Sequence, residues 1–419
     1  MKKIYPFLLL ASLLLFSCEG EDDYVPAEID SENPSTPLNL SASNITQTSA
    51  VLNWNPATDN EVVVSYNLYK NGNLVQESII ETSITLSVLS IGAEYRYSVT
   101  AVDNSDNESN ASNTLTFSTL PVTFKENLSE MNVFEGQLAD LIPSNDVHLY
   151  ELNTTLFTDY CQKQRLIRLP EGETMDYNNN DLLPLYPDNT LIAKTFYYNI
   201  DDRNPSLGKQ LIETRILLKI DGNWQVGNYI WNDAQTDAIY RETGSEIPIS
   251  YTNTQGNDIN LNYIIPSKQE CFNCHNNNDS TFPIGMKLRN MNFFPSYTNQ
   301  NQLDYFNDNG LLSGIPGTSG ISVLPDWTDD ANYSLSERSR AYMDVNCAHC
   351  HQPGGFTPPV YEMDFRYETP FDESGIFDSR FGITSRFEST TPYYRMPQLG
   401  RTVVHEEALD MLTEYINSL

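Results

Sequence analysis

The sequence is poor in positive charge. It contains 24 Lys and Arg residues against 56 Asp and Glu residues, which gives a formal net charge of −32. Nucleic acids and anionic membrane surfaces would repel such a chain. The deficit therefore argues against nucleic acid as a partner and permits a basic partner.

Long hydrophobic runs are missing after the first 17 residues. Residues 1–17 begin with Met1-Lys2-Lys3 and continue with an apolar stretch from Tyr5 to Phe16. That stretch is too short to span a bilayer, and with its basic start it predicts a secretory signal peptide. The remainder of the chain is expected to be exported.

The signal ends in Leu15-Phe-Ser-Cys18, which resembles a bacterial lipobox. The resemblance implies that Cys18 becomes the lipidated first residue; an ordinary signal peptide with an incidental cysteine is the alternative. Residues 18–36 are acidic and predict a disordered tether. The acidic residues after Cys18 also resemble the export signal of Bacteroidetes-type surface lipoproteins. This implies an outer-membrane or cell-surface lipoprotein of a Gram-negative bacterium that the lipid anchors in the membrane, with a periplasm-facing position as the alternative.

Cysteines are few and are not spread as in a disulfide scaffold. Of the six, Cys18 is assigned to the lipid and four form two Cys-x-x-Cys pairs. Cys161 is alone, without a neighbouring histidine. It is expected to be a small buried apolar residue.

Residues 37–120 contain short alternating runs separated by turn signals, for example "AVLNWNP" and "EYRYSVTAVD". The pattern predicts an all-β sandwich in which Trp54 lies in the core and Asn71-Gly72 turns a hairpin. The segment resembles a fibronectin type III domain. The resemblance implies that the Tyr95 hydroxyl binds back to the preceding turn and that the domain is a spacer or adhesive module.

Residues 121–266 are predicted to form a second β-rich domain. Strand-like runs such as "LIETRILLKIDGNWQVGNYIWND" are broken by Asn-rich turns and by Asp221-Gly222, a hairpin signal. Trp224, Tyr229 and Trp231 are expected to pack in the core, with a sugar-binding platform as the alternative.

From residue 267 onward the pattern becomes helical, and two Cys-x-x-Cys-His motifs occur there. The motif residues are Cys271, Cys274 and His275 in the first copy and Cys347, Cys350 and His351 in the second. Each copy follows an S-x-x-E capping box, which begins at Ser267 or Ser334 and predicts a helix start. His349, inside the second copy, is expected to face solvent.

This spacing suits covalent haem. A helix places the two thiols about one turn apart, where each can form a thioether with a vinyl group of the same porphyrin. The histidine that follows then lies under the porphyrin and can bind the iron. The sequence therefore predicts two covalently attached haem c groups, with His275 and His351 as iron ligands.

Two other chemistries compete with haem. A zinc site built from both cysteine pairs would have to join segments 72 residues apart, beyond the spacing of a compact zinc module. It would also leave unexplained why a histidine follows each pair. A redox dithiol is expected once, at the start of a helix in an α/β fold. Haem is therefore preferred.

Residues 334–419 resemble a class I cytochrome c, in which a helix leads to the motif, a loop supplies a methionine ligand and a C-terminal helix closes the domain. The resemblance implies Met396, before Pro397, as the sixth ligand of the second iron, with His405 as the weaker alternative. The methionines expected to be core or helix-face residues are Met343, Met363 and Met411.

Residues 267–333 are predicted to form a shorter first haem module. Met286 is the preferred sixth ligand; the alternatives are Met291, a distal His148 and an open position. The choice decides function, because an open iron binds peroxide or oxygen whereas a six-coordinate iron chiefly passes electrons.

Residues of about 122–419 resemble a family of exported bacterial proteins with a β-rich segment before two haem motifs. The signature stretches are "YELNTTLFTDYCQKQRLIRLPEG", "QECFNCHN", "RAYMDVNCAHCHQPGG" and "RMPQLGR". The expected chain is thus multidomain: a fibronectin-type β-sandwich, a β-rich domain and mainly α cytochrome c-like haem modules.

The leading functional prediction is a lipid-anchored di-haem electron-transfer protein rather than a catalyst. Its partner would be a redox protein or a small-molecule electron donor or acceptor. Two alternatives remain open: a di-haem peroxidase or oxidase with an open first iron, and a surface binding protein in which haem is structural.

Overall fold

The computed structural model describes residues 30–419. The predicted signal peptide (1–17), Cys18 and the tether up to residue 29 lie outside the described residues. Within them the chain divides into two compact units. Of the described residues, one unit contains 30–41, 52–84 and 96–115, and the other contains 116–419 together with the short segments 42–51 and 85–95.

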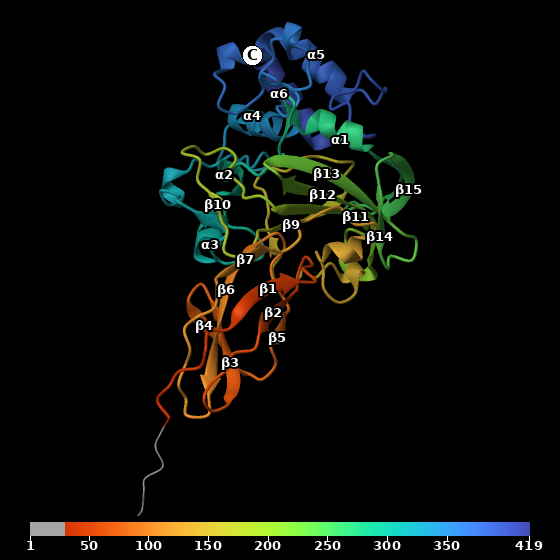
Figure 1. Ribbon diagram of the computed structural model, residues 1–419. Helices are drawn as coiled ribbons and strands as arrows, with labels where there is room; N and C mark the ends of the chain where they lie inside the picture. Colours follow the sequence, from red (N-terminus) through yellow and green to blue (C-terminus); the bar gives the residue numbers. More distant parts are fainter. Residues whose placement is uncertain (1–29) are drawn as a thin grey trace, which may run out of the picture. The chain divides into compact units, whose positions relative to one another are not determined.

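The fibronectin-like region consists of two antiparallel sheets (Figure 1). The first has the order β1 (Leu38–Ser43), β2 (Ala50–Asn55), β5 (Ser83–Leu86). The second has the order β4 (Asn73–Ile79), β3 (Val63–Lys70), β6 (Glu94–Asp103), β7 (Leu115–Ser118).

The residues predicted to shape this sandwich lie where the sequence placed them. Trp54 is buried and packs edge-on against Tyr66, with ring centroids 5.4 Å apart. Asn71 and Gly72 turn the β3–β4 hairpin with φ of 52° and 80°, the left-handed values that such a turn requires. The Tyr95 hydroxyl accepts a hydrogen bond from the Ser90 backbone N–H at 2.7 Å.

A six-stranded antiparallel sheet organises the larger unit. Its order is β14 (Ala238–Arg241), β13 (Asn223–Trp231), β12 (Lys209–Ile220), β11 (Leu191–Asn199), β9 (Gln162–Arg168), β8 (His148–Leu149). The remaining strands pair two by two: β15 (Ser245–Thr252) with β16 (Asp258–Ile265), β17 (Asn276–Asn277) with β18 (Ser280–Thr281), and β10 (Met175–Asp176) with β19 (Leu312–Ser313). Asp221 and Gly222 turn the β12–β13 hairpin, as predicted.

Both faces of this sheet are covered. Leu166, Leu191 and Ile216 of one face pack against residues 122–147, while Ile192 and Leu217 of the other face pack in a cluster that includes Cys271. The aromatic side chains of β13 are core residues rather than an exposed platform. Tyr229 and Trp231 are buried, and Trp224 packs edge-on against Tyr186. Cys161 is buried in an apolar cluster, as expected.

Six α-helices lie in the last third of the chain. They are α1 (Lys268–Cys274), α2 (Leu288–Met291), α3 (Gln302–Asp308), α4 (Leu335–Asn346), α5 (Ile376–Glu388) and α6 (Glu406–Asn417). Both predicted capping boxes are present: Ser267 caps α1 and Ser334 caps α4. The sequence did not predict α5. No described helix has both the length and the apolar character needed to cross a membrane.

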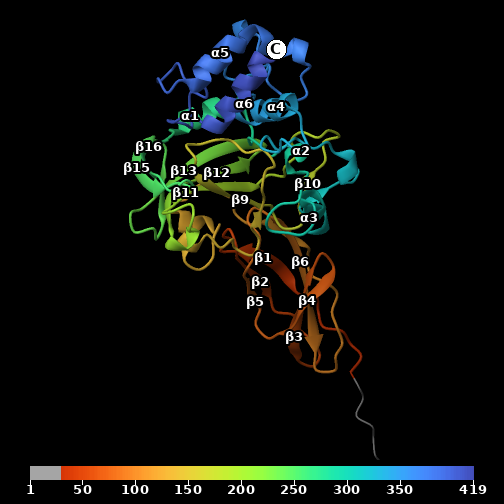
Figure 2. The same cartoon turned by 180° about the vertical axis from the view of Figure 1, so that it is seen from behind.

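Four of these helices gather on one side of the six-stranded sheet. Figures 1 and 2 show α1, α4, α5 and α6 together in opposite views. The closing helix α6 packs against α4 and α5 through Ala408, Met411, Leu412 and Tyr415. Short 3-10 helices complete the chain: Leu128–Met131, Leu138–Asp140, Pro205–Leu207, Thr318–Gly320, Pro359–Tyr361 and Phe371–Glu373.

Candidate functional site

A cavity of about 610 Å³ lies beside the second motif. This volume falls within the range of small-molecule and cofactor sites, about 300–1,000 Å³. Cys347, Cys350 and His351 line it, and so does Met396, which is 45 positions beyond His351 in the sequence. The rest of the lining is mainly apolar, from Phe356, Met363, Phe365, Ile383, Phe387, Leu399 and Leu412. The cavity therefore brings together all four residues predicted for the second haem.

Each motif histidine has its Nδ1 engaged by an oxygen a few residues downstream. His275 Nδ1 lies 2.9 Å from the Phe282 carbonyl oxygen, and His351 Nδ1 lies 3.2 Å from the Thr357 hydroxyl. A histidine that binds metal usually uses its second ring nitrogen in this way, which fixes the ring orientation and leaves Nε2 for the metal.

Both rings are also held neutral, as metal ligation requires. Burial lowers the pKa of His351 to about 4, with smaller contributions from His349 and Arg386. Burial likewise lowers the pKa of His275 well below its usual range, and Lys194 adds to this effect. Neither imidazole competes for a proton at neutral pH.

The loop that carries Met396 is held by the buried guanidinium of Arg401. Arg401 Nη2 donates to the carbonyl oxygens of Met396 and Phe387, both at 2.8 Å, and of Ser389 at 2.9 Å. The Arg401 side chain thus links the end of α5 to the turn that contains Met396. The sequence does not reveal this role of Arg401, which stands in "RMPQLGR", because a carbonyl-binding arginine has no local sequence signal.

The β-rich segment supports the same loop. The carboxylate of Asp159, which is buried, accepts hydrogen bonds from the backbone N–H groups of Thr402 at 2.6 Å and Val403 at 3.1 Å. Next to it, the Phe157 N–H donates to Asn346 Oδ1 at 2.7 Å, just before the second motif. Residues of the stretch 150–172 therefore position both ends of the second site.

The first motif is divided between core and cavity. Cys271 is buried in the apolar cluster on the sheet, and burial raises the pKa of its thiol to about 11. Cys274 instead lines the cavity of the second motif. Residues three apart on a helix differ in direction by about 60°. α1 lies at the edge of the core, so this angle turns its two thiols to different surroundings.

His349 corrects a prediction. The sequence suggested a solvent-facing residue, but His349 is only 8% exposed. The segment 282–287 comes back over it, and Phe282, Ile284 and Lys287 share a small pocket with it. The burial comes from a tertiary contact more than sixty residues distant in sequence.

Cys274, His349 and Cys350 form a compact group in which the possible ligand atoms all lie within 4.8 Å of one another. The Cys350 thiol donates to Cys274 and so lowers the pKa of Cys274 well below its usual range; His349 lowers it further. The spacing argument against a site shared by both cysteine pairs therefore fails for Cys274 and Cys350, because folding brings them together.

The two methionines considered for the first haem are packed in the core. Met286 and Met291 are both fully buried in the cluster that contains Cys271. The alternative His148 lies on the edge strand β8, where it pairs with Ile167 of β9. Of the methionines assigned to packing, Met343 and Met363 also line the cavity of the second motif.

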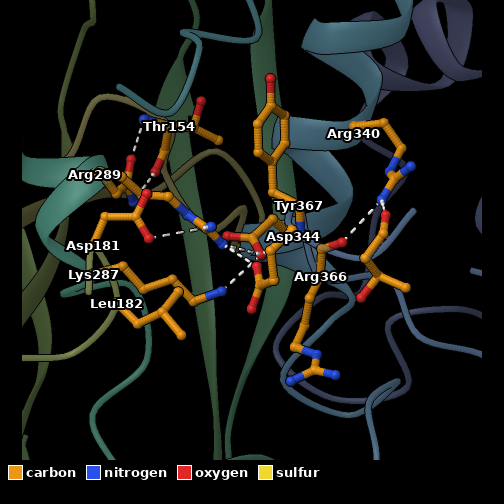
Figure 3. Close-up of polar contacts among 12 residues, drawn as sticks. Thr154, Asp181, Leu182, Lys287, Arg289, Arg340, Asp344, Arg366 and Tyr367 are labelled. Carbon is orange, nitrogen blue, oxygen red and sulfur yellow. Dashed lines mark hydrogen bonds and ion pairs between the residues drawn. The ribbon is translucent and has the colours of Figure 1, made fainter. Parts of the chain in front are cut away.

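A buried ionic cluster fixes α4 against the segment before it. Asp344, three residues before Cys347, accepts from Lys287 Nζ at 2.7 Å, from Arg289 Nη2 at 3.1 Å and from the Tyr367 N–H at 2.9 Å (Figure 3). The side chains of Asp344 and Arg289 are only 1% and 2% exposed. The cluster joins the segment after the first motif to the helix before the second.

His405 contacts Tyr342 of α4, and the burial of its ring leads to a prediction about pH. Its Nδ1 lies 2.8 Å from the Tyr342 hydroxyl, its ring stacks on Phe157 with centroids 4.1 Å apart, and burial lowers its pKa to about 4. The unfolded pKa is about 6.5, so the unfolded chain binds the proton more tightly. The stabilisation by neutral His405 is complete above pH 6.5 and is lost as the pH falls toward 4.

We expect this contribution to amount to about 2–3 kcal/mol of unfolding free energy. Urea unfolding of the wild type and of His405→Gln should therefore show a larger difference between the two proteins at pH 7 than at pH 4.5. An equal difference at both values would contradict the assignment.

Comparison with known proteins identifies one region. The model of the fibronectin type III domain matches residues 35–118. Chitinase A1 of Niallia circulans is 40% identical over 91 residues, 22% of this chain and 13% of that protein. Alpha-amylase of Niallia circulans is 42% identical over 95 residues, 23% of this chain and 7% of that protein. The chain thus spans less than a fifth of the length of these curated relatives.

Solved structures match the same region. The fibronectin type III domain of human fibronectin type III domain containing protein 3 is 22% identical, with a TM-score of 0.21, and covers 22% of this chain and 92% of that one. An Fn3-like protein from Clostridium thermocellum is 25% identical, with a TM-score of 0.19, and covers 22% of this chain and all of that one. It is the match of the family model that confirms the predicted fibronectin type III domain. The chain is multidomain and β-rich.

Proposed function

We propose that this protein is a di-haem c-type cytochrome that transfers electrons. The observation that carries the proposal is the single cavity into which Cys347, Cys350, His351 and Met396 converge. Chance packing does not require a Cys-x-x-Cys-His motif and a methionine 45 positions later to line the same space. The engaged Nδ1 atoms of both motif histidines support the same conclusion.

The roles of the second site follow from its lining. Cys347 and Cys350 would form the two thioethers, His351 Nε2 would be the proximal ligand and the Met396 sulfur the distal one. Haem iron alternates between two oxidation states and thereby passes single electrons. Arg401 holds the backbone of Met396, and the apolar side chains around the cavity exclude water, which favours six-coordination.

The first site is proposed with fewer supporting contacts. His275 is oriented by Phe282 as a ligand should be, and Cys271 and Cys274 offer the two thiols. Its sixth ligand remains a choice between Met286, Met291, His148 and an open position. A di-haem peroxidase or oxidase with an open iron at the first site is accordingly the catalytic version of this proposal.

The proposal is tested on the full-length chain exported from a host that attaches haem. Pyridine haemochrome absorbance should give two haems per polypeptide, and both should remain bound after denaturing electrophoresis. Absorption and paramagnetic-resonance spectra then give the axial ligands, and peroxide turnover that His275→Ala abolishes but Met396→Ala retains would favour the peroxidase. A protein exported without bound haem would end the proposal.

A thiolate metal site is the second candidate, and the Cys274–His349–Cys350 group favours it. Two thiolates and one imidazole are ligands that zinc accepts. If this candidate is right, a chain produced without haem attachment should bind one zinc per polypeptide. Cys274→Ser should abolish zinc binding, whereas Cys271→Ser should leave it unchanged. Two thioether haems in the exported protein would exclude it, because Cys274 and Cys350 would then be alkylated.

The fibronectin type III domain is proposed as a spacer between a lipid anchor at Cys18 and the haem-binding region. Similar domains occur in chitinases and an alpha-amylase, and there they make up only a small share of each protein. That distribution supports a connecting role. A surface binding protein with structural haem is the alternative, and a deletion of residues 37–120 that changes no binding or redox property would remove its main support.

A further inference from the structure

Three cationic side chains stand side by side on the face of the sheet that meets α1. Lys194 of β11 is paired with Arg165 of β9 on one side and with Arg215 of β12 on the other. Directly opposed residues point to the same face, with Cβ atoms about 5 Å apart. Two positions further along, Ile167, Ile192 and Leu217 of the same face pack in the cluster that contains Cys271. We name Arg165, Lys194 and Arg215 the cation row.

Only one member of the cation row has a counter-ion. Arg215 donates to Glu213 through Nε at 2.9 Å and Nη2 at 2.5 Å, and Glu213 also accepts from the Tyr263 hydroxyl at 2.7 Å. Across residues 30–419, the side chains of Arg165 and Lys194 have no hydrogen-bond or ion-pair partner, although Arg165 is only 8% exposed. Glu151 acts on Arg165 only at longer range and is itself bound by Ser296.

Such an arrangement is unfavourable without an anion. Like charges directly opposite each other on a sheet repel, and a buried charge without a partner loses its hydration without compensation. Burial and the neighbouring Arg215 and Arg165 lower the pKa of Lys194 to about 7. The chain has 56 acidic residues, yet none within the described part pairs with Arg165 or Lys194.

Two members of the cation row lie close to the first motif, and the third, Arg165, stands opposite Lys194. Lys194 and Arg215 act electrostatically on both Cys271 and His275. A haem carries two propionate carboxylates, and the cation row has two unpaired members. We propose that Arg165 and Lys194 bind the propionate carboxylates of the tetrapyrrole attached at Cys271 and Cys274. This inference rests on the proposed function, and it makes the β-rich domain part of the first haem site.

The test uses the haem-loaded, full-length protein. Lys194→Met and Arg165→Gln should each lower the melting temperature by at least about 3 °C, because a propionate loses its counter-ion. Each should also shift the midpoint potential of one haem to more negative values, because losing a nearby positive charge favours ferric iron. The other haem should keep its potential, and the haem count should stay at two. Lys194→Arg retains the charge and should keep both wild-type values.

Lys268→Met is the matched control. Lys268 lies in α1 three residues before Cys271, but its side chain is 49% exposed and pairs with the exposed Glu242. The substitution also removes one positive charge near the motif, but the midpoint potentials of both haems should remain those of the wild type.

The contrary results are distinct. A higher melting temperature in haem-loaded Lys194→Met would mean that the cations of the row repel one another without a bound anion. Unchanged midpoint potentials in both variants would show that no haem propionate contacts the cation row. Added acetate that raises the melting temperature of loaded wild type but not of Lys194→Met would mean that a free anion fills the row. Each of these results would overturn the inference. If the protein still bound two haems, the proposed function would stand. A wild type without haem defeats both.

Discussion

Replacing both cysteines of the second motif, Cys347→Ser with Cys350→Ser, is expected to halve the covalent haem content from two groups to one. Serine cannot form the thioether, and His351 and Met396 alone would hold a haem only non-covalently. The measurement is pyridine haemochrome absorbance per polypeptide after denaturing electrophoresis. The effect is all or none for this site, which makes it the largest functional change expected.

Cys161→Ala is the matched control for that experiment. Cys161 is a buried cysteine outside both motifs and packs in an apolar cluster with Phe196 and Ile249. Its removal should leave two haems, although it slightly weakens the core. If the serine double variant kept two covalent haems, or if Cys161→Ala lost one, the assignment of the thioether residues would be wrong.

The second large effect concerns stability, and we expect Asp344→Asn to lower the unfolding free energy by about 3 kcal/mol. The substitution keeps the size of the side chain but removes the charge between Lys287 and Arg289. Arg289, whose side chain is only 2% exposed, keeps its ion pair with Glu368 at 2.5 Å, so the loss comes from the buried ion pairs that the Asp344 carboxylate makes with Lys287 and Arg289. Urea unfolding of the haem-loaded protein, followed by the fluorescence of its tryptophans, measures the change.

Asp201→Asn is the control for Asp344→Asn. Asp201 pairs with Arg203 at 2.7 Å, but the Arg203 side chain is 53% exposed. Loss of this solvent-exposed pair should leave the unfolding free energy nearly unchanged, because water and salt screen it. An Asp344→Asn variant as stable as Asp201→Asn would show that the buried cluster does not hold α4.

Much of the local structure could be predicted from the sequence. Turn chemistry placed the hairpins at Asn71-Gly72 and Asp221-Gly222, since both positions need positive φ. The capping boxes at Ser267 and Ser334 placed the starts of α1 and α4, since one serine and one glutamate satisfy the free N–H groups there. α5 was missed because "IFDSRFGITSRFE" contains a glycine and three β-branched residues and lacks a strong apolar period.

Within the candidate site, sequence reasoning found the motif residues but not their supports. Phe282, Thr357, Arg401 and Asp159 act through hydrogen bonds to residues that lie up to 244 positions away. Such contacts have no periodicity and no fixed spacing. The expectation for His349 failed for the same reason, since its burial depends on the segment 282–287.

The sequence by itself determined the chemistry that this protein can hold, because two Cys-x-x-Cys-His motifs need only the local geometry of a helix end. It also determined the fibronectin type III domain, whose turns and core positions are local signals. Only the tertiary structure decided that Met396 lines the cavity of the second motif, that Cys274 meets Cys350, and that Lys194 lies near the first motif. Each of these is a contact between segments that are distant in the sequence. Such contacts depend on how the whole chain buries its apolar and charged side chains.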